Sequence, residues 1–301
     1  MQRANLRRFR PALFLLPVLV AACQPKAIPA QGAPEPPWAE VGRILKTTDA
    51  LTSGYHRFNF PRRDLTVRMG DVTLATALAF GSWAGFTGSP DKATMMGDLV
   101  LLPTELKAVQ AELARQHISV TAVHNHLAGE SPEVIYMHFH AQGVATELAT
   151  RLDPALSLTA TPRPVAAAAA PAPVTIDTAE VFRVLGARGR AQGNVAQLSF
   201  MLVNTPVTMD GHAVFPALGY GTPINLQAVS PERLVATGDF SVTGRQLAPL
   251  LTALAQHGIT ATAVHTHLVD ESPRIYFAHF WADGPTAAVL AGLRSALDAT
   301  R

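Results

Sequence analysis

The chain of 301 residues contains a single cysteine, Cys23, and its charged side chains make up only 15% of the composition. One cysteine excludes an intramolecular disulfide. Because Cys23 lies in an N-terminal leader, the folded part also lacks a thiolate metal site and a cysteine nucleophile. The chain has no serine-triad signature and no glycine-rich phosphate loop followed by a helix. We therefore expect stability to come from apolar packing, which a hydrophobic fraction of 48% can supply.

An excess of basic charge is also missing from the folded part, although the whole chain has a formal charge of +2. Four arginines lie within the first ten positions, and without them 20 basic side chains stand against 22 acidic ones. A nucleic-acid-binding domain needs a basic stripe on its folded surface. The composition therefore predicts no nucleic-acid partner.

The N-terminus has the three parts of an export signal: an arginine-rich start, an apolar run over 11–20, and small residues that lead to Cys23. The run is too short to span a bilayer as a permanent helix. The ending Val20-Ala21-Ala22-Cys23 resembles the bacterial lipobox, in which the cysteine is diacylated and becomes the first mature residue. We predict a lipid anchor at Cys23 that holds the protein to a membrane of the cell envelope. An ordinary cleaved signal with a chance cysteine is the alternative.

The most informative feature that is present is a histidine-rich internal repeat. The segment VHNHLAGESPEVIYMHFHAQG at 123–143 aligns without a gap with VHTHLVDESPRIYFAHFWADG at 264–284. These two segments hold seven of the eleven histidines. Gly97-Asp98 and Gly238-Asp239 match when the same alignment is continued toward the N-terminus, so the repeat extends beyond the histidines. The sequence therefore predicts two copies of one domain.

The pattern of the chain predicts an α+β fold, with a mostly antiparallel sheet and packed helices in each copy. Each copy contains a β-α-β-β-α unit, whose first crossover should be right-handed. The expected segments are a signal peptide at 1–22, a lipidated tether at 23–38, a first repeat domain at 39–157, a Pro/Ala linker at 158–175 and a second repeat domain at 176–301.

Individual elements follow from apolar spacing, proline positions and capping residues. In the first copy we predict a helix over 39–53, a strand over 95–102, a helix from 103 to about 117, hairpin strands over 118–127 and 134–141, and a helix over 144–152 stopped by Pro154. In the second copy we predict helices over 178–187 and from about 285, a strand over 234–242, and a helix capped by Thr243 and Gln246.

Each predicted hairpin carries residues that suit a metal ion. Residues two apart on a strand face the same side, so His124 and His126 project together, as do His138 and His140. If residues of equal parity pair across the hairpin, all four imidazoles meet on one face, whereas a slip of one residue separates the pairs. Neutral imidazole and carboxylate suit zinc first, and also iron, copper or nickel.

The set common to both copies is three histidines and one glutamate: His124, His126, Glu130 and His138 in the first, and His265, His267, Glu271 and His279 in the second. We predict the histidines as metal ligands. Glu130 and Glu271 are candidate catalytic bases if a coordination position is open to water or substrate.

Other polar residues are weaker candidates. His140 is an optional member of the set, because Trp281 replaces it in the second copy. Arg274 could bind an anion in the second copy alone, since Glu133 takes its place in the first. We interpret Asp98 and Asp239 as residues that end strands or bond to turns.

Three functions remain open at this point. The first is a metal-binding envelope protein, and the second is a metal-dependent enzyme, of hydrolase or oxygenase type, acting on an envelope small molecule or a cell-wall fragment. The third is a non-catalytic interaction or scaffold protein whose histidines only pack. The spacing H-x-H-x-x-x-E also resembles the first motif of the cupins, but helices before and after each hairpin disfavour a cupin barrel. The oligomeric state is left open.

Two longer segments carry a family resemblance: MGDLVLLPTELKAVQAELARQHISVTAVHNHLAGESPEVIYMH and TGDFSVTGRQLAPLLTALAQHGITATAVHTHLVDESPRIYFAHFWADG. Together with FGSWAGF in the first copy, they resemble the two halves of the bacterial LppY/LpqO lipoprotein family, whose function is unknown. The resemblance implies a secreted or lipid-anchored location and a two-copy architecture. It supplies no activity. Glu133 departs from the family pattern, which usually has arginine at this position.

Overall fold

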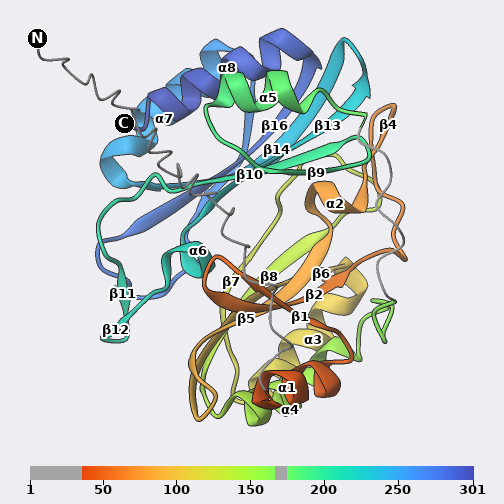
Figure 1. Cartoon of the computed structure of the whole chain (residues 1–301), viewed down its shortest axis with the longest axis vertical. Helices are drawn as coiled ribbons and strands as arrows, with labels where there is room; N and C mark the ends of the chain where they lie inside the picture. The colour runs from red at the N-terminus through yellow and green to blue at the C-terminus, as the bar shows by residue number, and fades with distance from the viewer. Residues whose placement is uncertain (1–35, 167–174) are drawn as a thin grey trace, which may run out of the picture. The chain divides into compact units, whose positions relative to one another are not determined.

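The computed structural model describes residues 36–166 and 175–301. The predicted signal peptide, Cys23, most of the tether and part of the linker lie outside these residues. The described residues form two tandem α+β domains, each with a six-stranded sheet and helices (Figure 1). None of the described helices is long and apolar enough to cross a membrane.

The sheet of the first domain has the strand order β1-β2-β5-β6-β8-β7, and each neighbouring pair is antiparallel. Helix α3 connects β6 to β7, and β8 then inserts between them. The elements of this domain are α1 (Pro36–Leu45), β1 (Asp49–Thr52), β2 (Tyr55–Pro61), β3 (Arg68–Met69), β4 (Val72–Thr73), α2 (Thr76–Ala79), β5 (Gly81–Ser89), β6 (Lys92–Leu101), α3 (Pro103–Arg115), β7 (Ser119–His124), β8 (Ile135–Gly143) and α4 (Ala145–Leu156).

The second domain repeats this plan with the order β15-β16-β14-β13-β10-β9, again with antiparallel neighbours. Its elements are α5 (Thr178–Leu185), β9 (Arg190–Gln192), β10 (Val195–Phe200), β11 (Thr208–Met209), β12 (His212–Ala213), α6 (Pro216–Gly219), β13 (Thr222–Ser230), β14 (Arg233–Thr243), α7 (Gly244–Gln256), β15 (Thr260–His265), β16 (Ile275–Pro285) and α8 (Thr286–Asp298).

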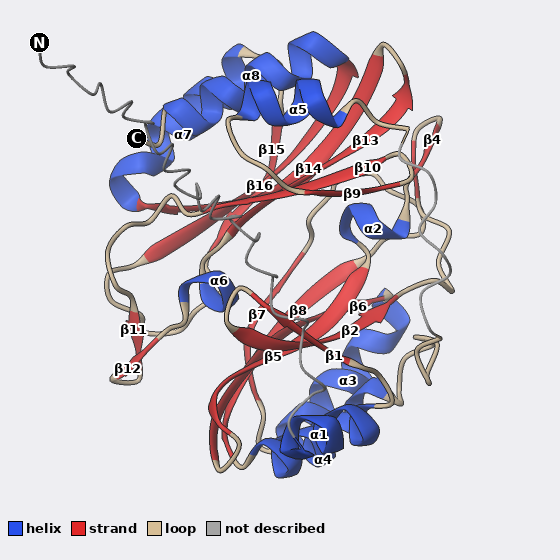
Figure 2. Cartoon of the chain, in the orientation of Figure 1, coloured by secondary structure: helices blue, strands red, loops and turns tan. Residues whose placement is uncertain are grey.

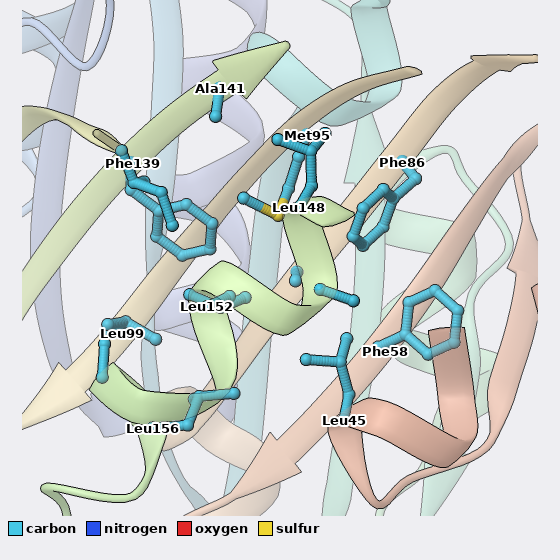
Figure 3. Packing of buried hydrophobic residues seen from close by; sticks show 14 of the residues in the cluster. Leu45, Phe58, Phe86, Met95, Leu99, Phe139, Ala141, Leu148, Leu152 and Leu156 are labelled. Carbon is cyan, nitrogen blue, oxygen red and sulfur yellow. The ribbon is translucent and has the colours of Figure 1, made fainter. Parts of the chain in front are cut away.

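Helices cover one face of each sheet: α1, α3 and α4 in the first domain, and α5, α7 and α8 in the second (Figure 2). In α4, Leu148, Leu152 and Leu156 are spaced four residues apart, so they form one apolar stripe along the helix. Figure 3 shows this stripe against Phe139 and other buried strand residues, and the three leucines and Phe139 are at most 1% exposed. The apolar cores therefore hold the helices onto the sheets.

The helix-covered face of β8 fixes where its histidines point. Met137, Phe139 and Ala141 belong to the core beneath the helices. Because side chains alternate along a strand, His138 and His140 lie on the opposite face of the sheet. The same alternation applies to β16, where Ala278 and Phe280 are core residues and His279 points away from them.

Each domain sends a short arm onto the other. The arm formed by β3, β4 and α2 is bonded to the second sheet, where Gln227 Nε2 donates to Thr73 O at 2.9 Å and Asn225 Nδ2 donates to Leu78 O at 2.7 Å. The arm formed by β11, β12 and α6 packs in return on residues of the first domain: its cluster contains Val214, Leu218, Tyr55 and Met96. These reciprocal contacts join the two sheets through the faces that the long helices leave uncovered.

Two predicted helix boundaries were wrong. The first helix ends at Leu45, and residues 49–52 form β1, because Ser53 and Gly54 both have positive φ and make a two-residue turn into β2. Leu51, which falls at roughly helical spacing within the predicted helix, is 58% exposed. Helix α4 runs through Pro154 to Leu156, because burial of Ala155 and Leu156 in the core offsets the hydrogen bond that Pro154 removes.

Other boundary signals were confirmed. Helix α3 begins at Pro103, and Thr243 with Gln246 forms the capping box of α7, with Thr243 N donating to Gln246 Oε1 at 2.8 Å. The described start of the predicted linker packs on the first domain rather than leaving it. Val165 N donates to Lys46 O at 2.9 Å, and Arg163 binds Asp153 at 2.6 Å.

Candidate metal centre

The two hairpins have the register that brings histidines onto one face. In the first, His124 pairs with Tyr136 and Ala122 with His138, so residues of equal parity are opposite each other at this end. A bulge between Val120 and Ala122 changes the register further along the strand. The second hairpin is built in the same way, with His265 opposite Phe277 and Ala263 opposite His279.

The histidines of both copies meet in one cluster rather than at two separate sites. His124 stacks on its own counterpart, His265, with ring centroids 4.0 Å apart. His126 stacks on His279 at 3.9 Å, and the equivalent pair, His267 and His138, stacks at 3.8 Å. These matching distances relate the two hairpins by an approximate twofold axis that passes between His124 and His265.

Two groups within this cluster have the geometry to hold a metal ion. The larger group consists of one nitrogen each from His124, His265, His267 and His279, all within 4.8 Å of one another. The smaller group consists of His126, Asp239 and His279. The larger group therefore takes three ligands from the second copy and one from the first.

The Nε2 atoms of the six histidines are buried and have no hydrogen-bond partner among the described residues: those of His124, His126, His138, His265, His267 and His279. Buried polar atoms in proteins are almost always hydrogen-bonded, and an unpaired one costs about 1–3 kcal/mol. Six unpaired atoms in one place are therefore an unfavourable arrangement unless a ligand satisfies them.

Burial lowers the pKa values of five of these imidazoles. It lowers the pKa of His138 to about 3 and that of His265 to about 4; His279 lowers both further, whereas Asp239 opposes the shift. Burial, and then the neighbouring imidazoles, also lower the pKa values of His124, His126 and His267. Neutral imidazole is the form that binds metal ions, so at neutral pH these five histidines are in the metal-binding form.

Two of the four candidate ligands are held in a defined tautomer. His279 Nδ1 lies 2.8 Å from Asp239 Oδ1, and His265 Nδ1 lies 3.2 Å from Thr266 O. A carboxylate and a carbonyl can only accept, so in each ring Nδ1 carries the proton and Nε2 keeps its lone pair. Bonds of this kind orient metal-binding histidines in known sites.

The interpretation of Asp98 and Asp239 as strand-ending residues was wrong. Both lie in the middle of their strands, β6 and β14, directly opposite His138 and His279. Asp98 Oδ2 is 3.8 Å from His138 Nε2. Burial and the nearby Asp239 raise the pKa of Asp98 well above its usual range. The match of the two aspartates in the internal repeat was the signal that could have placed them in the site.

The two glutamates predicted as catalytic brace the turns of the hairpins. Glu130 Oε1 accepts from Val134 N at 3.2 Å, and Glu271 Oε1 accepts from Ile275 N at 3.0 Å. Neither glutamate belongs to the two candidate metal groups. Both are buried, at 8% and 5% exposure, so they fix the backbone that follows the histidines.

Arg274 and His140 lie outside the metal groups. The Arg274 side chain is 48% exposed, and its Nε is 3.6 Å from Glu271 Oε1. In the first copy, Glu133 instead accepts from Asn125 Nδ2 at 3.1 Å. His140 lines a small separate cavity together with His212.

The fold and site define a two-domain α+β protein with a buried histidine cluster shared by its two copies. The family described as Domain of Unknown Function (DUF1259) matches residues 39–158 and 179–299. The two matches cover most of the chain, which therefore belongs to this family and carries two copies of its domain.

Comparison with individual proteins adds little. No curated protein matches this chain. Among solved structures, the crystal structure of EtuB from Clostridium kluyveri is 12% identical, over 84% of this chain and 90% of that chain, with a TM-score of 0.20. A TM-score this low carries no argument about fold or function.

Proposed function

We propose that this protein binds a divalent transition metal at one centre built jointly by its two domains. The observation that carries the proposal is the convergence of His124, His265, His267 and His279, whose nitrogens lie within 4.8 Å of one another. Their Nε2 atoms are buried without hydrogen-bond partners among the described residues. A bound cation would satisfy these atoms together.

The chemistry of the donors narrows the metal. Four neutral nitrogens suit zinc, copper, iron or nickel, and they do not suit magnesium or calcium, which prefer oxygen ligands. Zinc is the first choice because four histidines can fill its tetrahedral positions. Asp239 and the Thr266 carbonyl would orient two of the ligands through Nδ1.

The same ligand count favours metal binding over catalysis. A catalytic zinc site keeps one position for water or substrate, whereas four protein ligands close the site. The two glutamates that could act as bases each hold a backbone amide through Oε1. The scaffold hypothesis is disfavoured because packing alone leaves the six Nε2 atoms unsatisfied.

We also propose that the protein is exported and lipid-anchored at Cys23, as in the LppY/LpqO lipoproteins that it resembles. The support is in the sequence: a basic start, a short apolar run, and Val20-Ala21-Ala22-Cys23. Incorporation of a clickable fatty acid in the producing bacterium tests this. We expect label in the wild type and none in Cys23→Ala, and equal label in both would contradict the anchor.

Elemental mass spectrometry of the purified chain from residue 24 onward, reconstituted with zinc, tests metal binding. We expect stoichiometric zinc in the wild type and its loss in a His265→Ala/His267→Ala variant. The matched control is His257→Ala, which removes an exposed histidine at the end of α7 and should leave the zinc in place. No zinc, copper, iron or nickel in a folded wild type would contradict the proposal.

A further inference from the structure

Two methionines and two histidines that belong to neither candidate metal group line one small cavity. A cavity of about 10 Å³ is lined by Met96 of β6, His140 of β8, Met209 of β11 and His212 of β12. This room holds about one water molecule or a single ion. Met96 and His140 come from the first domain and Met209 and His212 from the second, so the cavity is completed by the arm of β11 and β12.

The lining of the cavity favours a soft cation. The remaining residues are neutral: three polar side chains, Thr87, Thr94 and Gln142, and four apolar ones. The cavity offers no carboxylate, which hard cations such as calcium and magnesium require. Thioether and imidazole together suit Cu(I), which is soft and monovalent.

The approximate twofold symmetry of the chain supplies an internal comparison. In the alignment of the two copies, the positions equivalent to Met96 and His140 are Thr237 and Trp281. The bridges Arg68–Ser131 and Thr208–Ser272 align the two arms, so Met69 and Val72 correspond to Met209 and His212. Trp281 and Met69 pack there against an apolar cluster that contains Val72. Apolar side chains therefore fill the space that is equivalent to the cavity. Neither of the positions equivalent to His140 and His212 is a histidine.

Access to the cavity is limited but not closed. Met96, Met209 and His140 are 7%, 5% and 9% exposed. His212 is exposed, in the two-residue strand β12. An arriving ion can therefore meet His212 first and then the three buried donors.

We propose that Met96, His140, Met209 and His212 form a binding site for Cu(I), separate from the histidine cluster. The residues of this site belong to neither of the candidate metal groups described above. The proposed Cu(I) site can therefore be tested independently of zinc binding at the histidine cluster.

Methionine-methyl NMR with Ag(I) tests the site directly, because Ag(I) has the coordination preferences of Cu(I) without its redox chemistry. The zinc-treated chain, labelled with ¹³C at the methionine methyl groups, is titrated with silver. We expect the Met96 and Met209 methyl signals to shift together and to saturate. Met201, which is 41% exposed, reports adventitious binding to a surface thioether. If Met201 shifts before or together with these two, or if neither of them shifts, the proposal is wrong.

A matched pair of variants measures the contribution of the sulfur atoms. Met209→Leu keeps side-chain volume, so folding should be retained. We expect the affinity for Cu(I), measured anaerobically against a chromogenic Cu(I) chelator, to fall at least about tenfold, or about 1.4 kcal/mol. Met69→Leu, at the equivalent position, should leave Cu(I) affinity unchanged, and both variants should keep the zinc stoichiometry of the wild type. Equal Cu(I) affinities of the two variants would overturn the proposal.

Discussion

The two hairpins have the same histidine spacing, yet the carboxylates behind them are placed differently. In the second copy, Asp239 Oδ1 lies 2.8 Å from His279 Nδ1, within hydrogen-bond distance. In the first copy, Asp98 Oδ2 lies 3.8 Å from His138 Nε2, beyond that distance. The larger metal group also takes three of its four histidines from the second copy. The two copies of the repeat are therefore unequal, and the second copy supplies most of the candidate metal ligands.

The largest expected effect comes from removing the same histidine of the repeat in one copy or in the other. His267→Ala removes a member of the four-histidine group, whereas His126→Ala removes the residue at the same position in the first copy, which lies outside that group. We expect His267→Ala to lose stoichiometric zinc and His126→Ala to retain most of it. Isothermal titration with zinc measures both. Equal losses would show that the two copies contribute equally.

The next effect concerns the aspartates. Asp239→Asn replaces the carboxylate that holds the His279 proton, and losing such a partner typically weakens metal affinity by about 10–100-fold. Asp98→Asn should weaken it less, since Asp98 makes no hydrogen bond to a histidine among the described residues. Zinc competition with a chelator gives both affinities. A greater loss for Asp98→Asn than for Asp239→Asn would contradict the larger role that we propose for the second copy.

A smaller effect is acid destabilisation of the metal-free protein. Burial lowers the folded-state pKa of His265 to about 4 and of His138 to about 3, whereas an unfolded histidine titrates near 6.5. Below about pH 6.5 the unfolded state therefore binds more protons, and stability should fall as pH falls toward these values. The raised pKa of Asp98 acts in the opposite direction.

Urea unfolding of the metal-free chain at pH 7 and pH 5 measures this loss. His138→Phe and His265→Phe each remove one titrating group, so each should narrow the difference between the two midpoints. If neither variant narrows the difference, the lowered pKa values of these two histidines are contradicted.

The smallest effect is expected at the hairpin turns. Arg274→Glu places a glutamate at the position of the second copy that is equivalent to Glu133 of the first copy. Because the Arg274 side chain is half exposed, its interaction with Glu271 should contribute at most about 1 kcal/mol. We expect zinc affinity to stay unchanged and the unfolding midpoint to move little. A loss of zinc affinity would show that this turn contributes to metal binding, contrary to its geometry.

Local patterns in the sequence predicted much of the fold because the signals are local. Helix α3 and the capping box of α7 depend on residues within a few positions of each other, and both were found. The first helix was extended too far because Leu51 fits its period, although Leu51 is exposed on β1. Periodicity cannot show that Ser53 and Gly54 form a turn that starts a new strand pair.

The site was only partly predictable because it depends on contacts between distant segments. The spacing identified the histidines, but their meeting in one cluster requires the two domains to pack through their arms, as at Gln227 and Thr73. The positions of Asp98 and Asp239 depend on the pairing of β6 with β8 and of β14 with β16. No local pattern gives that pairing.

The most direct test of a single shared centre is the zinc stoichiometry of the wild type beside His124→Ala. His124 is the one member of the four-histidine group that comes from the first copy. We predict one tightly bound zinc per chain in the wild type and none at micromolar zinc in His124→Ala. Two zinc ions per chain in the wild type and one in His124→Ala would show independent sites in the two copies and would contradict the account.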